Sequence, residues 1–193
     1  SYGISANLAT LHNEVKSMGG ATRIEDTYSN GFVYFDEGQP VWSYYGYEYQ
    51  GVNPEDGKPI YRDVDGDGTI NDKDKVFLGS AIPKFNYGIT LNAAYKGFDF
   101  TLFGSGNYGG KLVLSNRGRP GANLPEEYWT QSWDVKGAGA KYPHPDLNDS
   151  YQFLSSMQLS SGSYFKIKQI QLGYTLPKKL TQKIQVSNLR LFM

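Results

Sequence analysis

Strict alternation of apolar and polar residues predicts two antiparallel strands over residues 85–108. The apolar parity of the first strand carries Phe85, Tyr87, Ile89, Leu91, Ala93 and Tyr95, and the other parity carries Asn86, Gly88, Thr90, Asn92 and Ala94. A period of two over eleven residues is typical of a strand rather than a helix. Lys96-Gly97 predicts a two-residue turn, because glycine readily takes a positive φ. The return strand carries Phe98, Phe100 and Leu102 on one face, and Phe103 breaks its pattern.

A further strand is expected over residues 164–176, where the alternation changes parity once. Its later half has Ile170, Leu172, Tyr174 and Leu176 on one face, whereas Phe165 and Ile167 lie on the opposite parity. Either a β-bulge lies near Lys168, or the start of the strand projects beyond the surface that its later half faces. Weaker alternation at residues 4–8 and 189–193 indicates two more strands, and the tyrosine-rich segment 41–50 is expected to be extended.

One long segment, 109–163, lacks clear periodicity and is predicted to be a loop. It is rich in Gly, Pro, Asn and Ser, and its longest helix candidate, residues 125–133, is short. A loop of that length is uncommon in a compact domain and indicates a functional or mobile excursion.

The composition agrees with a β protein. Among 193 residues there are 16 Tyr, 10 Phe and 3 Trp, yet the mean hydropathy is −0.52, so the chain is rich in rings and poor in aliphatic bulk. No stretch reaches the roughly 20 apolar residues of a membrane helix, but a membrane β-strand needs only about 9–11 alternating residues. The fold class predicted from the residues is therefore all-β and antiparallel, with a membrane location left open.

Charge and reactive side chains exclude several function classes. The 19 basic and 19 acidic side chains balance, which argues against a nucleic-acid surface. The chain has no cysteine, and His12 and His144 lack a nucleophile context, so we expect no enzyme activity. The G-x-G-x-x-G match at residues 104–109 is not followed by a helical pattern, which a dinucleotide site requires.

An acidic twelve-residue segment, 63–74, matches a calcium-binding loop. Oxygen ligands would come from positions 1, 3, 5, 7, 9 and 12, which are Asp63, Asp65, Asp67, Thr69 through its carbonyl, Asn71 and Asp74. Calcium takes six to eight hard oxygen ligands, and this spacing wraps the chain around one ion. The alternative is a solvated acidic turn without a metal.

Three aromatic residues of the long segment 109–163 are candidate ligand contacts. Tyr128, Trp129 and Trp133 could stack on a sugar or a peptide. Alternatively, they anchor the segment to the rest of the protein.

Three blocks, taken in order, resemble the C-terminal part of the SusC/RagA family of TonB-linked outer-membrane proteins. The first is GQPVWSYYGY at residues 38–47. The second is YRDVDGDG at 61–68, followed by GSAIPKFNYG at 79–88 and YKGFD at 95–99. The third is GSYFKIKQIQLGYTLP at 162–177.

The resemblance implies part of a 22-stranded transmembrane β-barrel in the bacterial outer membrane. Such proteins import oligosaccharides or peptides, take energy from TonB, and are capped by a SusD-like lipoprotein. Residues 1–193 would form a C-terminal portion of the barrel, without the plug, the N-terminal part that meets TonB, or the final strands. The turns at 96–97 and 178–187 would be periplasmic, and 51–84 and 109–163 would be extracellular loops. Ring-rich strand faces would meet the lipid bilayer.

A secreted calcium-binding β module that binds a glycan or a protein partner is the alternative. The two hypotheses differ in what the apolar faces contact. A β-sandwich buries Phe98, Phe100, Ile170 and Leu172 between two sheets, whereas a barrel wall turns them outward.

Overall fold

The computed structural model describes residues 1–21, 23–25, 32–114, 123–145 and 149–193. The chain divides into two compact units, which we describe separately. The sheet unit comprises Ser1–Leu11, Pro83–Gly109 and Ser163–Met193. The loop unit comprises His12–Ile82 and Gly110–Gly162. The fold is mostly antiparallel β, as predicted.

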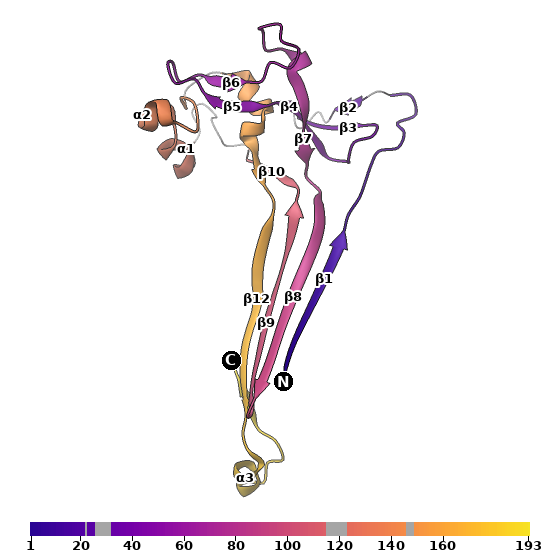
Figure 1. Ribbon diagram of the computed structural model, residues 1–193, viewed down its shortest axis with the longest axis vertical. Helices are drawn as coiled ribbons and strands as arrows, with labels where there is room; N and C mark the ends of the chain where they lie inside the picture. Colours follow the sequence, from indigo (N-terminus) through magenta and orange to yellow (C-terminus); the bar gives the residue numbers. More distant parts are fainter. Residues whose placement is uncertain (22, 26–31, 115–122, 146–148) are drawn as a thin grey trace. The chain divides into compact units, whose positions relative to one another are not determined.

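The sheet unit is one antiparallel sheet of five strands in the order β1-β8-β9-β12-β13 (Figure 1). Its strands are β1 (Tyr2–Thr10), β8 (Pro83–Tyr95), β9 (Phe98–Gly109), β12 (Tyr164–Thr175) and β13 (Arg190–Phe192). Four of the five are 9 to 13 residues long, which suits the crossing of a bilayer by tilted strands. Within the part of the chain that the structure describes, the strands do not close into a barrel.

The predicted hairpin is confirmed in both its register and its turn. Tyr95 pairs with Phe98, so Lys96 and Gly97 form a two-residue connection. Lys96 has φ 47° and Gly97 has φ 88°. Positive φ at both central residues matches the right-handed twist of the flanking strands.

A β-bulge at Lys168 accounts for the change of parity in β12. The register against β9 shifts between Ile167, which lies opposite Gly104, and Gln169, which lies opposite Phe103. The extra residue returns Phe165 and Ile167 to the face that carries Ile170. The first of the two readings of this strand is therefore correct.

The connection between β12 and β13 is longer than a simple turn. It contains a helical turn, α3 (Lys178–Thr181), followed by a 3-10 turn, η6 (Gln182–Ile184). Pro177 stands at the N-cap of α3, where its fixed φ is compatible with the helix start and its missing N–H costs nothing. Thr181 is buried, whereas Leu180 is 53% exposed.

The loop unit contains short strands and helical turns rather than two bare loops. A four-stranded sheet has the order β2-β3-β4-β7, and two further strand pairs are β5-β6 and β10-β11. The strands are β2 (Arg23–Glu25), β3 (Val33–Asp36), β4 (Ser43–Tyr47), β5 (Tyr49–Val52), β6 (Pro59–Tyr61), β7 (Lys75–Ser80), β10 (Lys111–Val113) and β11 (Leu159–Ser161). The helical segments are η2 (Asp72–Asp74), α1 (Glu126–Thr130), α2 (Trp133–Lys136), η3 (Gly137–Gly139), η4 (Ser150–Leu154) and η5 (Ser156–Gln158).

Tyrosine rings supply much of the buried core of the loop unit. One cluster contains Phe32, Tyr44 and Leu159, and a second contains Tyr128, Tyr142 and Met157. The first cluster joins the segment before residue 82 to the segment after residue 140. The second joins helix α1 to the segment after residue 140. Side chains far apart in the sequence thus hold the unit together. Among the described residues, none of the helices has the length and apolar character needed to cross a membrane.

Candidate functional site

The sheet unit has one continuous apolar face that extends over all its long strands. Cross-strand pairs place Ile4 opposite Leu91, Leu91 opposite Leu102, and Leu102 opposite Ile170. Because side chains one residue apart point to opposite faces, these register pairs fix the whole face. Ile4 is 73% exposed and Ile170 is 64% exposed, so this face has no protein layer packed on it in the sheet unit.

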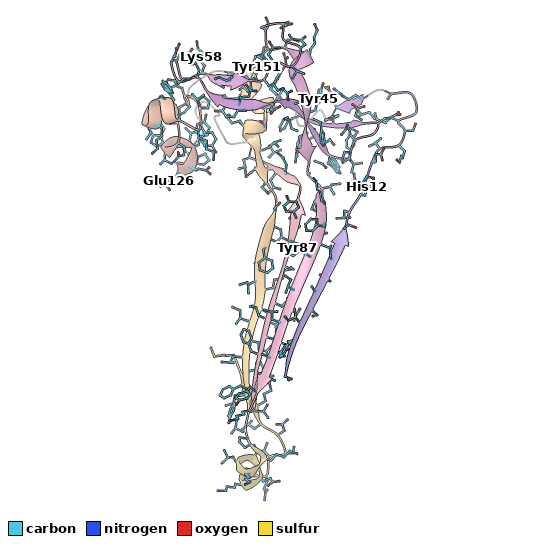
Figure 2. All side chains as sticks on the ribbon, in the orientation of Figure 1. His12, Tyr45, Lys58, Tyr87, Glu126 and Tyr151 are labelled. Carbon is cyan, nitrogen blue, oxygen red and sulfur yellow. The ribbon has the colours of Figure 1, made fainter. Side chains whose placement is uncertain are left out.

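Aromatic rings border this apolar face at both ends. At the end near the start of β8, Phe85 stacks on Tyr108 with ring centroids 5.1 Å apart, and Tyr87 stacks on Phe165 at 5.9 Å. Figure 2 labels Tyr87 on the sheet. At the turn end, the Phe98 and Tyr174 centroids are 4.5 Å apart. Two belts of rings with aliphatic residues between them are typical of a barrel wall in a bilayer.

Gly104 makes room for one of these rings. A Cβ placed on Gly104 would lie 2.4 Å from Cζ of Phe165, so the ring of Phe165 covers the bare backbone of β9. The glycines of the G-x-G-x-x-G match therefore serve strand packing, as β9 continues through Gly109 without a helix. The nucleotide-binding interpretation of that match is not supported.

The opposite face of the sheet is polar. Its cross-strand pairs include Asn92 with Thr101 and Thr101 with Gln171. The hydroxyl of Thr101 donates to Oδ1 of Asn92 at 3.0 Å. Phe103, which breaks the sequence pattern, lies on this face opposite Thr90. A polar face of this kind suits the water-filled interior of a large barrel.

An ion pair lies on the polar face close to the β8–β9 turn. Nε of Arg190 donates to Oδ2 of Asp99 at 3.0 Å. The pair crosses over Gly173 of β12, which lies opposite Asp99 in the register. No sequence pattern indicated this contact, since its partners are 91 residues apart.

Three of the six predicted calcium ligands converge in the acidic loop. Carboxylate oxygens of Asp63, Asp65 and Asp67 lie within 4.8 Å of one another. The two oxygens of Asp63 accept from the N–H groups of Gly66 at 2.7 Å and Gly68 at 2.8 Å. These bonds curl the backbone around the Asp63 carboxylate.

The other three predicted ligands are occupied with the loop's own hydrogen bonds. Asn71 Nδ2 donates to the carbonyl of Thr69 at 2.9 Å, and Asn71 caps η2. The fully buried carboxylate of Asp74 accepts from the N–H groups of Asn71 at 2.8 Å and Val64 at 2.7 Å. These two hydrogen bonds lower the pKa of Asp74, and the bond from Asn71 has the larger effect. Asp74 stands outside the convergent cluster of three carboxylates.

The donor set fits calcium in part. Three carboxylates supply hard oxygen ligands at one place, and each carboxylate oxygen can accept a metal as well as a hydrogen bond. The Thr69 carbonyl and the Asn71 side chain lie next to this cluster, as the hydrogen bond from Asn71 Nδ2 to Asp67 at 3.4 Å indicates. Calcium binding stays a prediction.

Two tyrosines that the sequence did not single out anchor the acidic loop. Tyr151 donates its hydroxyl to the carbonyl of Ile70 at 3.1 Å, and Tyr47 donates to Asp72 at 3.4 Å. The two rings pack edge to face at 4.8 Å. Burial raises the pKa of Tyr47 to about 12, so its hydroxyl remains a donor at neutral pH. Figure 2 labels Tyr151.

The three candidate aromatic contacts lie in different surroundings. Tyr128 is 1% exposed and stacks on Tyr142 with centroids 4.7 Å apart. Trp133 contacts Gly57 and packs edge to face with His144, whose Nδ1 contacts Oδ1 of Asp134. Trp129 is 49% exposed, and of the three it is the ring most open to a ligand.

Taken together, the two faces of the sheet have the character of a transmembrane barrel wall. Comparisons with known proteins agree with this class. No family model matches the sequence. TonB-dependent receptor P3 of Formosa agariphila is 27% identical over 175 residues, which are 81% of this chain and 17% of that protein. TonB-dependent receptor P26 of the same organism is 28% identical over 134 residues, 63% of this chain and 13% of that protein.

Solved structures share the fold. A chain in the structure of the RagAB peptide transporter matches 99% of this chain with a TM-score of 0.76 at 20% identity. The RagAB peptide importer in its open-open and closed-closed states gives TM-scores of 0.75 and 0.76, both at 18% identity. This chain spans 22% of the chain in each of those structures.

The resemblance found in the sequence is confirmed by these comparisons. The curated proteins to which the chain is similar are TonB-dependent receptors, and its fold is similar to that of a stretch of a chain in the RagAB transporter structures. The relatives are receptors and transporters rather than enzymes, in agreement with the expectation from the sequence.

Proposed function

We propose that this chain forms part of the wall of a TonB-dependent transporter in the bacterial outer membrane. The observation that carries the proposal is the sheet's ring-bordered apolar face, backed by a polar face. Along β8, the ten residue steps from Phe85 to Tyr95, at about 3.3 Å each and tilted by about 40°, span about 25 Å of membrane. That height matches the apolar band of outer-membrane barrels.

The secreted-module alternative requires a second sheet over the apolar face. Phe98 is 53% exposed, Ile170 64% and Leu172 46%, and no second layer covers them within the sheet unit. In water, an apolar face of this size would drive association or aggregation. The exposed rings therefore favour lipid as the neighbour of this face.

The connections suggest an orientation. Barrels of this kind have short periplasmic turns and long extracellular loops. The two-residue turn at Lys96-Gly97 would then face the periplasm, as would the α3 connection. The loop unit, which includes the predicted loops 51–84 and 109–163 and also residues 12–50, would lie at the cell surface.

The transported substrate and the partners follow from the relatives. RagAB is a peptide transporter, so a peptide or an oligosaccharide of similar size is the proposed cargo. A SusD-like surface lipoprotein would cap the barrel over the loop unit, with Trp129 as a candidate contact for cargo. TonB would act through a part of the receptor outside the residues described here.

A calcium ion is the proposed cofactor of the acidic loop. Asp63, Asp65 and Asp67 would hold it, with oxygen from Thr69 and Asn71 and support from Asp74. The ion would supply only charge neutralisation and rigidity, since the cluster places three carboxylates within 4.8 Å.

Single introduced cysteines test the proposed location, because this chain has none of its own. Lys58→Cys lies in the loop unit, where Figure 2 labels Lys58, and Lys179→Cys lies in α3. In intact cells that produce the complete receptor, a membrane-impermeant maleimide should label Lys58→Cys. It should label Lys179→Cys only after the outer membrane has been permeabilised. The unsubstituted receptor is the background control.

Equal labelling of both variants in intact cells would contradict the orientation. Recovery of the protein in the soluble fraction, with both sites labelled, would contradict the membrane location itself.

A further inference from the structure

The two units differ sharply in charge, although the whole chain is neutral. Of the 19 basic side chains eight lie in the sheet unit, and of the 19 acidic side chains only Asp99 does. The sheet unit therefore has a formal charge of +7 and the loop unit −7. A division this strong indicates that the sheet unit meets something anionic.

Half of these basic side chains gather at the turn end of the sheet. Lys96 lies in the β8–β9 turn, and Lys178, Lys179 and Lys183 lie in the connection between β12 and β13. All four are exposed. We call these four residues the lysine surface.

The lysine surface has no acidic side chain of its own unit to neutralise it. Asp99 is the sheet unit's one acidic residue, and it is ion-paired with Arg190. Four exposed ammonium groups near one another repel unless anions lie close by. Their mutual repulsion is thus destabilising when the unit stands alone, and an anionic partner would relieve it.

Aromatic and apolar residues beside the lysine surface identify that partner as a lipid headgroup layer. Nζ of Lys96 is 5.2 Å from the centroid of Tyr95, which belongs with Phe98 and Tyr174 to the ring belt at this end. Leu180, between the lysines, is 53% exposed. Rings at headgroup depth with lysines just beyond them place the ammonium groups at the phosphates. A soluble acidic protein would not account for the exposed rings and leucine.

We propose that Lys96, Lys178, Lys179 and Lys183 form a binding surface for the headgroups of anionic phospholipids. This inference rests on the proposed function, because it takes the turn end as the periplasmic leaflet of the outer membrane. Each lysine near an anionic membrane surface strengthens binding by about fivefold. The lysine surface would hold the wall at a fixed depth and collect anionic lipid around it.

Lipid binding by the complete natural protein, purified in detergent, tests this proposal. The turn-end variant replaces Lys178, Lys179 and Lys183 with Gln. Lys96 is left unchanged because its backbone has a positive φ of 47°, which a substitution could disturb. The matched control replaces Lys84, Lys166 and Lys168 with Gln, which removes the same charge from the same unit away from the turn. Each protein is incubated with equal amounts of phosphatidylglycerol and phosphatidylethanolamine, and retained lipids are counted by native mass spectrometry.

The parent and the control should retain more phosphatidylglycerol than phosphatidylethanolamine. In the turn-end variant the ratio of the two retained lipids should fall by about tenfold or more. An equal preference in parent and turn-end variant would overturn the proposal and leave the lysines to an acidic protein partner. Displacement of the lipid by an equal concentration of glycerol 1-phosphate would also overturn it, because free phosphate would then suffice. If the parent does not fractionate with membranes, the proposed function fails; if it does but has no lipid preference, this inference alone fails.

Discussion

The carboxylate of Asp99 on β9 and the guanidinium of Arg190 on β13 meet across the intervening strand β12, directly over Gly173. A Cβ on Gly173 would lie 2.5 Å from Oδ2 of Asp99 and 2.7 Å from Nη2 of Arg190. Because Gly173 has no side chain, Asp99 and Arg190 can pair across β12 and so link β9 to β13 on the polar face.

Gly173→Val should separate this pair. We expect it to lower the free energy of unfolding by about 1–3 kcal/mol, because a side chain forced into a filled site displaces its neighbours. Urea unfolding of the detergent-solubilised protein measures the change. Arg190→Gln, which removes only the partly exposed ion pair, should cost clearly less, because exposed ion pairs contribute little to stability. A Gly173→Val protein as stable as the parent would show that the pair does not need this space.

Gly104 and Phe165 should be energetically coupled on the apolar face. Gly104→Ala pushes a Cβ against the Phe165 ring and should destabilise the sheet by about 1–3 kcal/mol. In a Phe165→Ala background the same substitution should cost clearly less, because the obstructing ring is gone. A double-mutant cycle by urea unfolding gives the coupling energy. Additive effects of the two substitutions would contradict the packing described here.

The sequence predicted the sheet unit far better than the loop unit, for a physical reason. Strands of 9 to 13 residues repeat the two-residue period many times, so the hairpin at 85–108 and the bulge at Lys168 left clear patterns. In the loop unit most strands have three to five residues. Their position depends on partners far away in the sequence, such as Tyr44 with Leu159, and no local pattern records such partners.

The candidate sites show the same limit. The spacing from Asp63 to Asp67 predicted the three carboxylates that converge, because neighbours within five residues are set by local geometry. The anchors Tyr47 and Tyr151 were not predicted, since they reach the acidic loop from 25 and 81 residues away. Likewise, no pattern in the sequence predicted that Tyr128 is buried and stacks on Tyr142.

The acidic loop should loosen at low pH through Asp74. The backbone N–H groups of Asn71 and Val64 hold the pKa of Asp74 below its usual range. A carboxyl with a depressed folded pKa contributes stability that is present above its unfolded pKa, about 3.9, and is lost as the pH falls through the folded value. Amide hydrogen exchange at Val64 and Asn71, corrected for intrinsic rates, should therefore rise below about pH 4.

Asp74→Asn is the control for this pH dependence. It removes the titrating group, so protection at Val64 should be lower at neutral pH and should no longer fall in acid. Acid sensitivity unchanged in Asp74→Asn would assign the effect to another carboxylate of the loop.

Calcium binding should depend on the convergent carboxylates. Asp65→Asn and Asp67→Asn should each weaken calcium binding by about tenfold or more, because each removes a charged ligand from a hard-cation site. Asp56→Asn, whose carboxylate is paired with Lys58 outside the loop, should leave binding unchanged. Isothermal calorimetry on the detergent-solubilised receptor measures all three. No calcium binding by the parent, or an equal loss in Asp56→Asn, would contradict the proposal.

The assignment of the apolar face to lipid is the central claim, and adjacent residues of one strand test it most directly. Ile170 lies on the apolar face of β12 and Gln171 on the polar face, opposite Leu102 and Thr101 respectively. Ile170→Arg should reduce the amount of heat-modifiable, folded receptor in the outer membrane, since an arginine near the bilayer midplane costs about 2–4 kcal/mol. Gln171→Arg should assemble like the parent, because its side chain would enter water. If both variants assemble equally well, or if Gln171→Arg is the one that fails, the apolar face does not meet lipid.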